Sequence, residues 1–140
     1  MRQALGMFAV IAAVLLAADR WVGYEAAYEI GYGALALMAA MIAATFLWLW
    51  YERTTPLALG MAFSWSGAAC VLGWWWVFNL LDRPVAMEGS EVLFAFLSLY
   101  FVGAILHFTV MQRSLGLNGG LFAIPLLGAT LTSALIHLII

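Results

Sequence analysis

His107 is the residue best suited to chemistry inside the long apolar stretches of this 140-residue chain. Its position relative to Arg113, at about 1.5 Å per helical residue, places it about 9 Å inside the end of its stretch. Thr45 and Ser64 come out at comparable depths on two other stretches, so we expect the three side chains to form an inner pocket. Such a histidine can ligate a haem or a chlorophyll-type pigment, or relay a proton at a quinone. The alternative is a neutral histidine hydrogen-bonded to a neighbouring helix, and the identity of any cofactor stays unknown.

A second candidate site consists of charged residues that lie between the apolar stretches. Its members are Asp19, Arg20, Glu25, Glu29, Asp82, Arg83, Glu88 and Glu91. The carboxylates of this group can hold a divalent cation or dock a basic partner, provided that several oxygens converge. The alternative is that these acids are solvated at helix starts, where the helix dipole favours negative charge. A stripe of tyrosines at four-residue spacing, Tyr24, Tyr28 and Tyr32, lies in the same region.

Other kinds of chemistry find little support in the sequence. Cys70 is the only cysteine, which excludes an intramolecular disulfide and a cysteine-rich metal site. The sequence contains no catalytic triad, phosphate-binding glycine loop or metalloprotease helix pattern. Ion-coupled transporters usually carry an ionisable group within the membrane, and no carboxylate falls near the centre of an apolar stretch. The sequence therefore disfavours ion-coupled transport.

The elements that must position these residues are five apolar stretches. All five arginines and all seven acidic residues lie between the stretches or at their ends, and 67% of the chain is hydrophobic. Helices of about 20 residues can cross about 30 Å of hydrocarbon, and the alternation typical of an outer-membrane barrel is missing. We therefore expect an all-α integral membrane protein in which residues 1–140 form a single bundle of five transmembrane helices. The expected spans are 4–22, 30–51, 57–81, 92–112 and 119–140.

The distribution of arginines predicts the orientation of these spans. Arg2, Arg53 and Arg113 fall on one side of the expected membrane, and Arg20 and Arg83 fall on the other. The positive-inside rule then places the N-terminus in the cytoplasm and the C-terminus outside, in a bacterial-type inner membrane. The outer side carries six of the seven acidic residues, which suits a cation or a basic protein as a partner and not nucleic acid.

A short sequence pattern occurs twice on the expected outer side. Residues 19–25 and 82–88 share the pattern Asp-Arg-x-Val-x-x-Glu, and each copy joins the two helices of one hairpin. A duplicated hairpin, helices one and two repeated as helices three and four, followed by a fifth helix, is one interpretation. It corresponds to a parallel repeat about an axis along the membrane normal. The other interpretation is coincidence between two polar helix ends.

Small and aromatic residues predict how the helices pack. Small residues let membrane helices approach closely, and two such stripes are Ala36, Ala40 and Ala44, with Ala39 and Ala43 beside them, and Gly60, Ser64 and Ala68. Three consecutive tryptophans, residues 74–76, point in directions about 100° apart on a helix, so at least one is expected to face protein, lipid or pigment. Pro125 is expected to kink the fifth helix modestly.

Three functions are compatible with these features. The first is a non-catalytic accessory or assembly subunit of a larger membrane complex, such as a respiratory or photosynthetic one. The second is a small oligomeric transporter or channel with an acidic outer vestibule. The third is an integral-membrane enzyme or cofactor protein that uses His107. The expected partners are the lipid bilayer and other membrane subunits or further copies of the chain.

Overall fold

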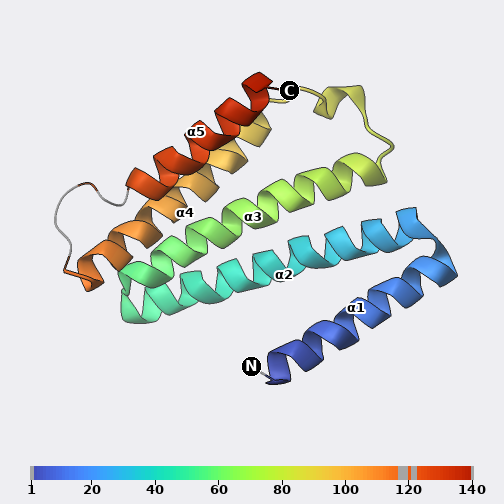
Figure 1. The fold of residues 1–140 in the computed structure, drawn as a ribbon, viewed down its shortest axis with the longest axis horizontal. Helices are drawn as coiled ribbons and strands as arrows, with labels where there is room; N and C mark the ends of the chain where they lie inside the picture. The colour runs from blue at the N-terminus through green and yellow to red at the C-terminus, as the bar shows by residue number, and fades with distance from the viewer. Residues whose placement is uncertain (1, 117–119, 121–122, 140) are drawn as a thin grey trace.

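The computed structural model describes residues 2–116, 120 and 123–139, and these contain five α-helices, one short 3₁₀ helix and no strand. The elements in chain order are α1 (Arg2–Val22), α2 (Tyr24–Arg53), α3 (Pro56–Leu80), η1 (Val85–Met87), α4 (Val92–Ser114) and α5 (Ala123–Ile139). Successive α-helices run antiparallel, with α3 between α2 and α4, and α5 beside α4 (Figure 1). The most extensive helix contacts join α3 to α2 and to α4, whereas α1 and α5 contact their neighbours much less. The packed centre of the molecule is therefore the layer formed by α2, α3 and α4.

The contact between α2 and α3 is made by small residues that allow a close approach. Gly33, Ala36, Ala39 and Ala43 are the buried residues of α2. The indole of Trp76 lies over Gly33 so closely that a Cβ atom added there would be 2.6 Å from Trp76 Cε2. The expected stripe was partly wrong, because Ala40 and Ala44 are exposed. Burial follows spacings of three and four residues, which keep the contact on one side of the helix.

The contact between α3 and α4 is closer still. Gly60, Gly67 and Gly103 are buried, and a Cβ atom on Gly67 would lie 2.7 Å from Tyr100 Cα. One turn further along, Gly103 faces the backbone of Ser64, and its added Cβ would lie 2.6 Å from Ser64 Cα. The two helices therefore pack almost backbone to backbone, as small residues permit in membrane helices.

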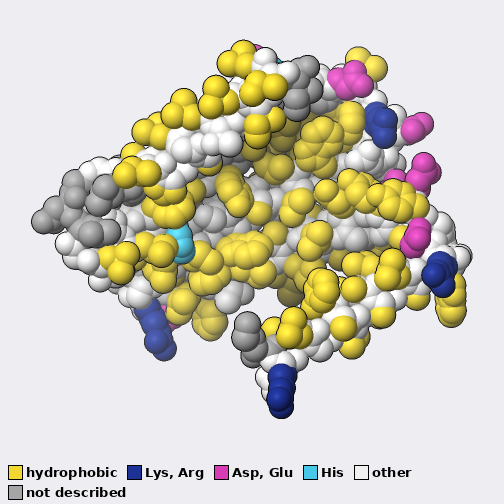
Figure 2. Space-filling model, in the orientation of Figure 1, with side chains coloured by type: hydrophobic (Ala, Val, Ile, Leu, Met, Phe, Trp, Pro, Cys, Tyr) yellow, Lys and Arg dark blue, Asp and Glu magenta, His cyan; other side chains and the backbone are white. Residues whose placement is uncertain are grey.

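Large apolar side chains cover the outside of the molecule instead of its interior. Among the described residues, the buried hydrophobic ones are all alanines, whereas Phe8 is 71% exposed and Leu138 is 81% exposed. Figure 2 shows apolar side chains along the helices and acidic side chains gathered at one end. α1 and the described part of α5 contain no buried residue. This arrangement is the reverse of that in a water-soluble domain.

Four of the helices, α1 to α4, are long and apolar enough to cross a membrane. Within the described residues α5 has 17 residues, which gives a length of about 25 Å against about 30 Å of hydrocarbon. The expected start of the fifth span at Gly119 lies outside the described residues. Pro125 falls in the first turn of α5 as described, a position where a missing N–H breaks no helical hydrogen bond, and the expected kink at this residue stays a prediction.

The connection between α1 and α2 is shorter than the apolar pattern predicts. α2 begins at Tyr24, six residues before the expected span, because Gly23 reverses the chain by itself with φ at +87°. That backbone conformation is open to glycine and strained for other residues. The polar residues 24–29 consequently form the first turns of α2 and not a loop.

The two copies of the Asp-Arg-x-Val-x-x-Glu pattern have different backbone conformations. Asp19 and Arg20 belong to the last turn of α1. Asp82 and Arg83 follow α3 and both have left-handed φ angles, 60° and 58°. Residues 81–91 then form a longer connection that contains η1. The copies occupy the same end of the molecule but do not build the same turn.

Candidate functional site

The acidic end of the molecule is the end where α1 and α3 finish and α2 and α4 begin. Antiparallel helices bring these four termini together, although they are far apart in the sequence (Figure 1). All eight predicted outer-face residues lie at this end. The antiparallel order of the helices thus brings these charges to one end of the molecule, and the remaining geometry decides which of them line a common cavity.

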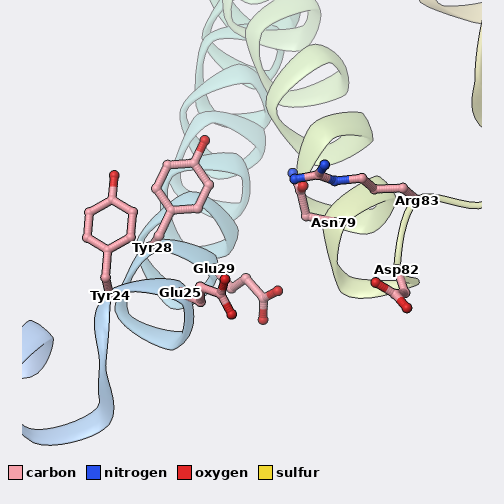
Figure 3. A pocket seen from close by; sticks show the side chains of 7 residues that line it. All are labelled: Tyr24, Glu25, Tyr28, Glu29, Asn79, Asp82 and Arg83. Carbon is pink, nitrogen blue, oxygen red and sulfur yellow. The ribbon is translucent and has the colours of Figure 1, made fainter.

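A cleft of about 520 Å³ lies between the first turns of α2 and the end of α3. Its lining residues are Tyr24, Glu25, Tyr28, Glu29, Asn79, Asp82 and Arg83. Figure 3 shows Glu25 and Glu29 together on the α2 side, and the Arg83 guanidinium beside Asn79 on the α3 side. Three carboxylates and one guanidinium give the cleft a formal charge of −2.

Local helix geometry explains how these side chains reach the cleft. Glu25 and Glu29 are four residues apart on α2 and therefore share a face, and Glu25 lies in the first turn, where the helix dipole favours an anion. Asn79 is anchored, because its Nδ2 donates a 2.8 Å hydrogen bond to the Trp75 carbonyl. The left-handed conformation at Arg83 follows the end of α3, where the dipole favours a cation.

The charges of the cleft do not neutralise one another. Within the described residues, no ion pair joins Arg83 to Glu25, Glu29 or Asp82. Figure 3 shows the carboxylates of Glu25 and Glu29 apart from the Arg83 guanidinium, which lies beside Asn79. The cleft therefore presents separated anionic and cationic groups to anything that enters it.

The cleft ends one helical turn below its charged groups. Gly33 lies four residues after Glu29 on α2, and Trp76 lies three residues before Asn79 on α3. Their close contact fills the space between the two helices at that depth. The cleft is therefore a pocket at the end of the α2–α3 pair and does not continue between these two helices.

An apolar groove of about 300 Å³ adjoins the cleft on the other side of the tyrosines. It runs between α1 and α2 and is lined by Leu15, Leu16, Asp19, Tyr24, Ala27, Tyr28, Gly31, Tyr32 and Leu35. The predicted tyrosine stripe forms a ladder here, with ring centroids 6.0 Å apart for Tyr24 and Tyr28 and 4.4 Å apart for Tyr28 and Tyr32. Tyr24 and Tyr28 line both the cleft and the groove.

The structure divides the predicted outer-face site into separate parts. Glu25, Glu29, Asp82 and Arg83 meet in the cleft. Asp19 lines the groove, and Glu88 lines a different pocket beside η1 with Trp74 and Trp75. Arg20 and Glu91 are exposed and line none of these cavities. No group of three or more metal-ligating residues occurs in the part of the chain that the structure describes, so the carboxylates do not converge as a hard cation requires.

The structure does not bring all three residues of the predicted inner pocket together. His107 and Ser64 both lie in the α3–α4 contact, where the backbone nitrogen of His107 lies against Gly60 and Ser64 lies against Gly103. Thr45 is exposed on α2 and donates a 2.8 Å hydrogen bond to the Met41 carbonyl of its own helix. The Nδ1 atom of His107 is buried without a hydrogen-bond partner. The α3–α4 contact therefore contains Ser64 and His107, whereas Thr45 is exposed on α2.

Two contributors to the cleft were missed by sequence reasoning, Asn79 and the tryptophan that closes its base. Asn79 lies three residues before Asp82 and four before Arg83, a spacing that would have placed it on their side of the helix end. The expectation that one of the three consecutive tryptophans faces protein is confirmed by Trp76 on Gly33 and by Trp74, whose ring centroid is 6.0 Å from that of Phe96.

Comparisons with known proteins do not assign the chain to a family. No family model, curated protein or solved structure gives a significant match to the chain.

Proposed function

We propose that this chain is an integral membrane protein that acts as a non-catalytic accessory or assembly subunit of a larger membrane complex, such as a respiratory or photosynthetic one. The observation that carries the proposal is the position of α1 and α5, which bury no described residue although both are strongly apolar. Lipid can cover such surfaces, and so can helices of another subunit or of a second copy. Association of membrane helices relies on packing contacts of this kind.

The cleft weighs against the alternative of a transporter or channel with an acidic vestibule. An acidic opening is present, but Trp76 on Gly33 closes it one turn below Glu29. A path for ions would have to run elsewhere, for example between copies of the chain. Flux in reconstituted liposomes that depends on Glu25 and Glu29 would support the vestibule.

The alternative of an enzyme or cofactor protein rests on His107. Its unpartnered Nδ1 is compatible with a ligand or with a further protein contact. The close approach of α3 and α4 at Gly60 leaves little space for a planar pigment beside it. An absorption band of the purified protein that disappears in His107→Ala would favour the hypothesis that His107 binds a cofactor.

The proposal also includes the membrane orientation of the chain and the origin of its hairpins. The arginine distribution supports a bacterial-type inner membrane with the N-terminus in the cytoplasm and, with five spans, the C-terminus outside. The duplicated hairpin is supported by the repeated sequence pattern, whose two copies lie at one end of the molecule. Their different backbone conformations imply divergence since any duplication.

The test of the proposed function is purification of the tagged full chain from its native membranes in a mild detergent. We expect at least one other membrane protein to co-purify with the chain in a fixed ratio, whereas an oligomer of this chain alone would favour the transporter or channel alternative. Mass spectrometry identifies the partner, and light scattering gives the mass of the complex. A monodisperse single chain with no companion would refute the proposal.

Matched variants locate the surface that holds the partner. Ala13→Trp with Ala17→Trp adds bulk to the exposed surface of α1, and Gly128→Trp with Thr132→Trp adds bulk to that of α5. We expect at least one pair to release the partner while the purified chain unfolds at its usual temperature. If both double variants retained the partner, the interface would have to lie on helices other than α1 and α5.

A further inference from the structure

The polar cleft and the apolar groove meet along one edge. Tyr24 and Tyr28 line both cavities, so the two spaces adjoin around the start of α2. One space presents carboxylates and a guanidinium, and the other is lined mainly by leucine, alanine, glycine and tyrosine side chains. A ligand that occupies both must have a charged head and a hydrocarbon tail.

The separated charges of the cleft specify the head of this ligand. Glu25 and Glu29 on α2 suit an ammonium group, and Arg83 with Asn79 on α3 suits a phosphate. A zwitterion that carries both groups satisfies the two sides of the cleft at once. An anionic headgroup would bring negative charge toward Glu25 and Glu29 with nothing to offset it.

The tyrosines discriminate between two kinds of ammonium group. A quaternary ammonium is bound through open aromatic faces that surround it. Here the rings pack on one another, with centroids 4.4 Å apart for Tyr28 and Tyr32, so they do not form such a cage. A primary ammonium instead donates hydrogen bonds, which the carboxylates of Glu25 and Glu29 can accept.

The surrounding helices suit a lipid that enters from the bilayer. α1 buries none of its residues, and a Cβ atom on Gly31 would meet no atom within 4 Å, so the groove is open beside α2. Trp76 on Gly33 prevents the head from sinking further between α2 and α3. The charged residues lie at the helix ends, at the depth that headgroups occupy if the helices span a membrane.

We propose that the cleft and the groove together bind one phospholipid with an ethanolamine headgroup. Its ammonium is held by Glu25 and Glu29, its phosphate by Arg83 and Asn79, and one acyl chain lies in the groove between α1 and α2. The inference rests on the membrane placement in the proposed function, but it does not require a partner subunit.

The test is native mass spectrometry of the purified full chain with equal amounts of phosphatidylethanolamine, phosphatidylcholine and phosphatidylglycerol of identical acyl chains. We expect the ethanolamine lipid to be retained about tenfold more than either of the others, since charge-assisted hydrogen bonds are lost with a quaternary amine or an anionic head. Equal retention of the three lipids would overturn the inference.

Variants separate the parts of the site. The double change Glu25→Gln and Glu29→Gln should abolish the preference for the ethanolamine lipid over the choline lipid. Arg83→Gln should instead weaken the binding of both lipids to the same extent. The matched control is Glu88→Gln with Glu91→Gln, which removes two carboxylates from the same end of the molecule outside the cleft. If this control also lost the preference for the ethanolamine lipid, general surface charge would explain the effect, and the proposed site would be refuted.

Two further experiments show whether the ligand is a lipid or a soluble molecule, and whether a negative result concerns the lipid site or the membrane placement. Free phosphoethanolamine that competes as strongly as the whole lipid would show a soluble ligand and overturn the lipid assignment. Carbonate extraction of membranes that releases the chain would refute the membrane placement itself. A chain that stays in the membrane but shows no lipid preference would refute only the further inference.

Discussion

Alanine and glycine residues make the closest contacts in this molecule, and their small size has energetic consequences. The buried hydrophobic residues in the described part of the chain are Ala36, Ala39, Ala43, Ala58 and Ala62. In a membrane, exclusion of apolar groups from water does not drive helices together, so van der Waals packing at short range must do so. Each methyl group added at such a contact therefore separates two helices and does not improve the packing.

Gly103→Ala tests this close packing. The added Cβ would overlap the backbone of Ser64, which cannot move without displacing α3. We expect the free energy of unfolding to fall by about 1–3 kcal/mol, the usual cost of overpacking. Thermal unfolding in detergent, followed by circular dichroism, measures the change.

Gly128→Ala is the matched control, because its Cβ would meet no atom within 4 Å in α5. An unchanged stability, or a gain of up to about 1 kcal/mol from helix propensity, is expected there. If both variants lost the same stability, the close contact of α3 and α4 would not be the cause.

At the scale of the elements, α1 is joined to the packed layer of three helices by the single residue Gly23. The positive φ of Gly23 sets the angle between α1 and α2, and few contacts elsewhere hold α1 in place. This angle also shapes the groove in which we place an acyl chain. The geometry of one residue thus controls an element and part of the candidate site.

Gly23→Ala should change the position of α1 and leave the three-helix layer intact. The new side chain makes the present backbone angles cost about 1–3 kcal/mol, and movement of α1 relieves that strain. Spin labels on cysteines at Leu5 and Met41, in a Cys70→Ala background, measure the distance between α1 and α2. We expect this distance to shift, with little change in the unfolding temperature.

Gly6→Ala is the control, since Gly6 lies within α1, has no positive φ and leaves room for a Cβ. An unmoved α1 in Gly23→Ala, combined with a large loss of stability, would contradict the idea that Gly23 acts as a local hinge.

At the scale of the whole molecule, the charges separate into two ends and the apolar side chains cover the length between them (Figure 2). α1 to α4 are each long enough to cross a bilayer. This distribution matches a slab of hydrocarbon with water on both sides. The arginines alone favour one of the two possible orientations.

Single cysteines test this orientation. Thr55 lies in the turn between α2 and α3, and Ala86 lies in η1 at the acidic end, and both are exposed. In a Cys70→Ala background in spheroplasts, a membrane-impermeant maleimide should label Ala86→Cys directly and Thr55→Cys only after permeabilisation. The reverse pattern would invert the topology, and equal labelling of both sites in intact spheroplasts would contradict a membrane-spanning α3.

Much of the architecture follows from the sequence because it depends on local properties. Hydropathy and length mark where a helix must lie, and the positions of Arg53, Asp82 and Arg113 mark where it must stop. For α3 and α4 this reasoning came within two residues of the observed ends. It placed the start of the second span at residue 30 although α2 begins at Tyr24, because hydropathy does not reveal the chain reversal at Gly23.

The sequence by itself determined the helical class, the approximate helix ends and the placement of six carboxylates at one end, because each is a property of residues close together in the chain. Only the tertiary structure decided that Glu29 and Arg83 line one cleft, that Trp76 packs on Gly33 at its base, and that Thr45 is exposed while His107 lies in the α3–α4 contact. These pairings join residues more than forty positions apart. They depend on the register in which glycine and alanine allow helices to approach, and many registers are compatible with the same pattern of small residues.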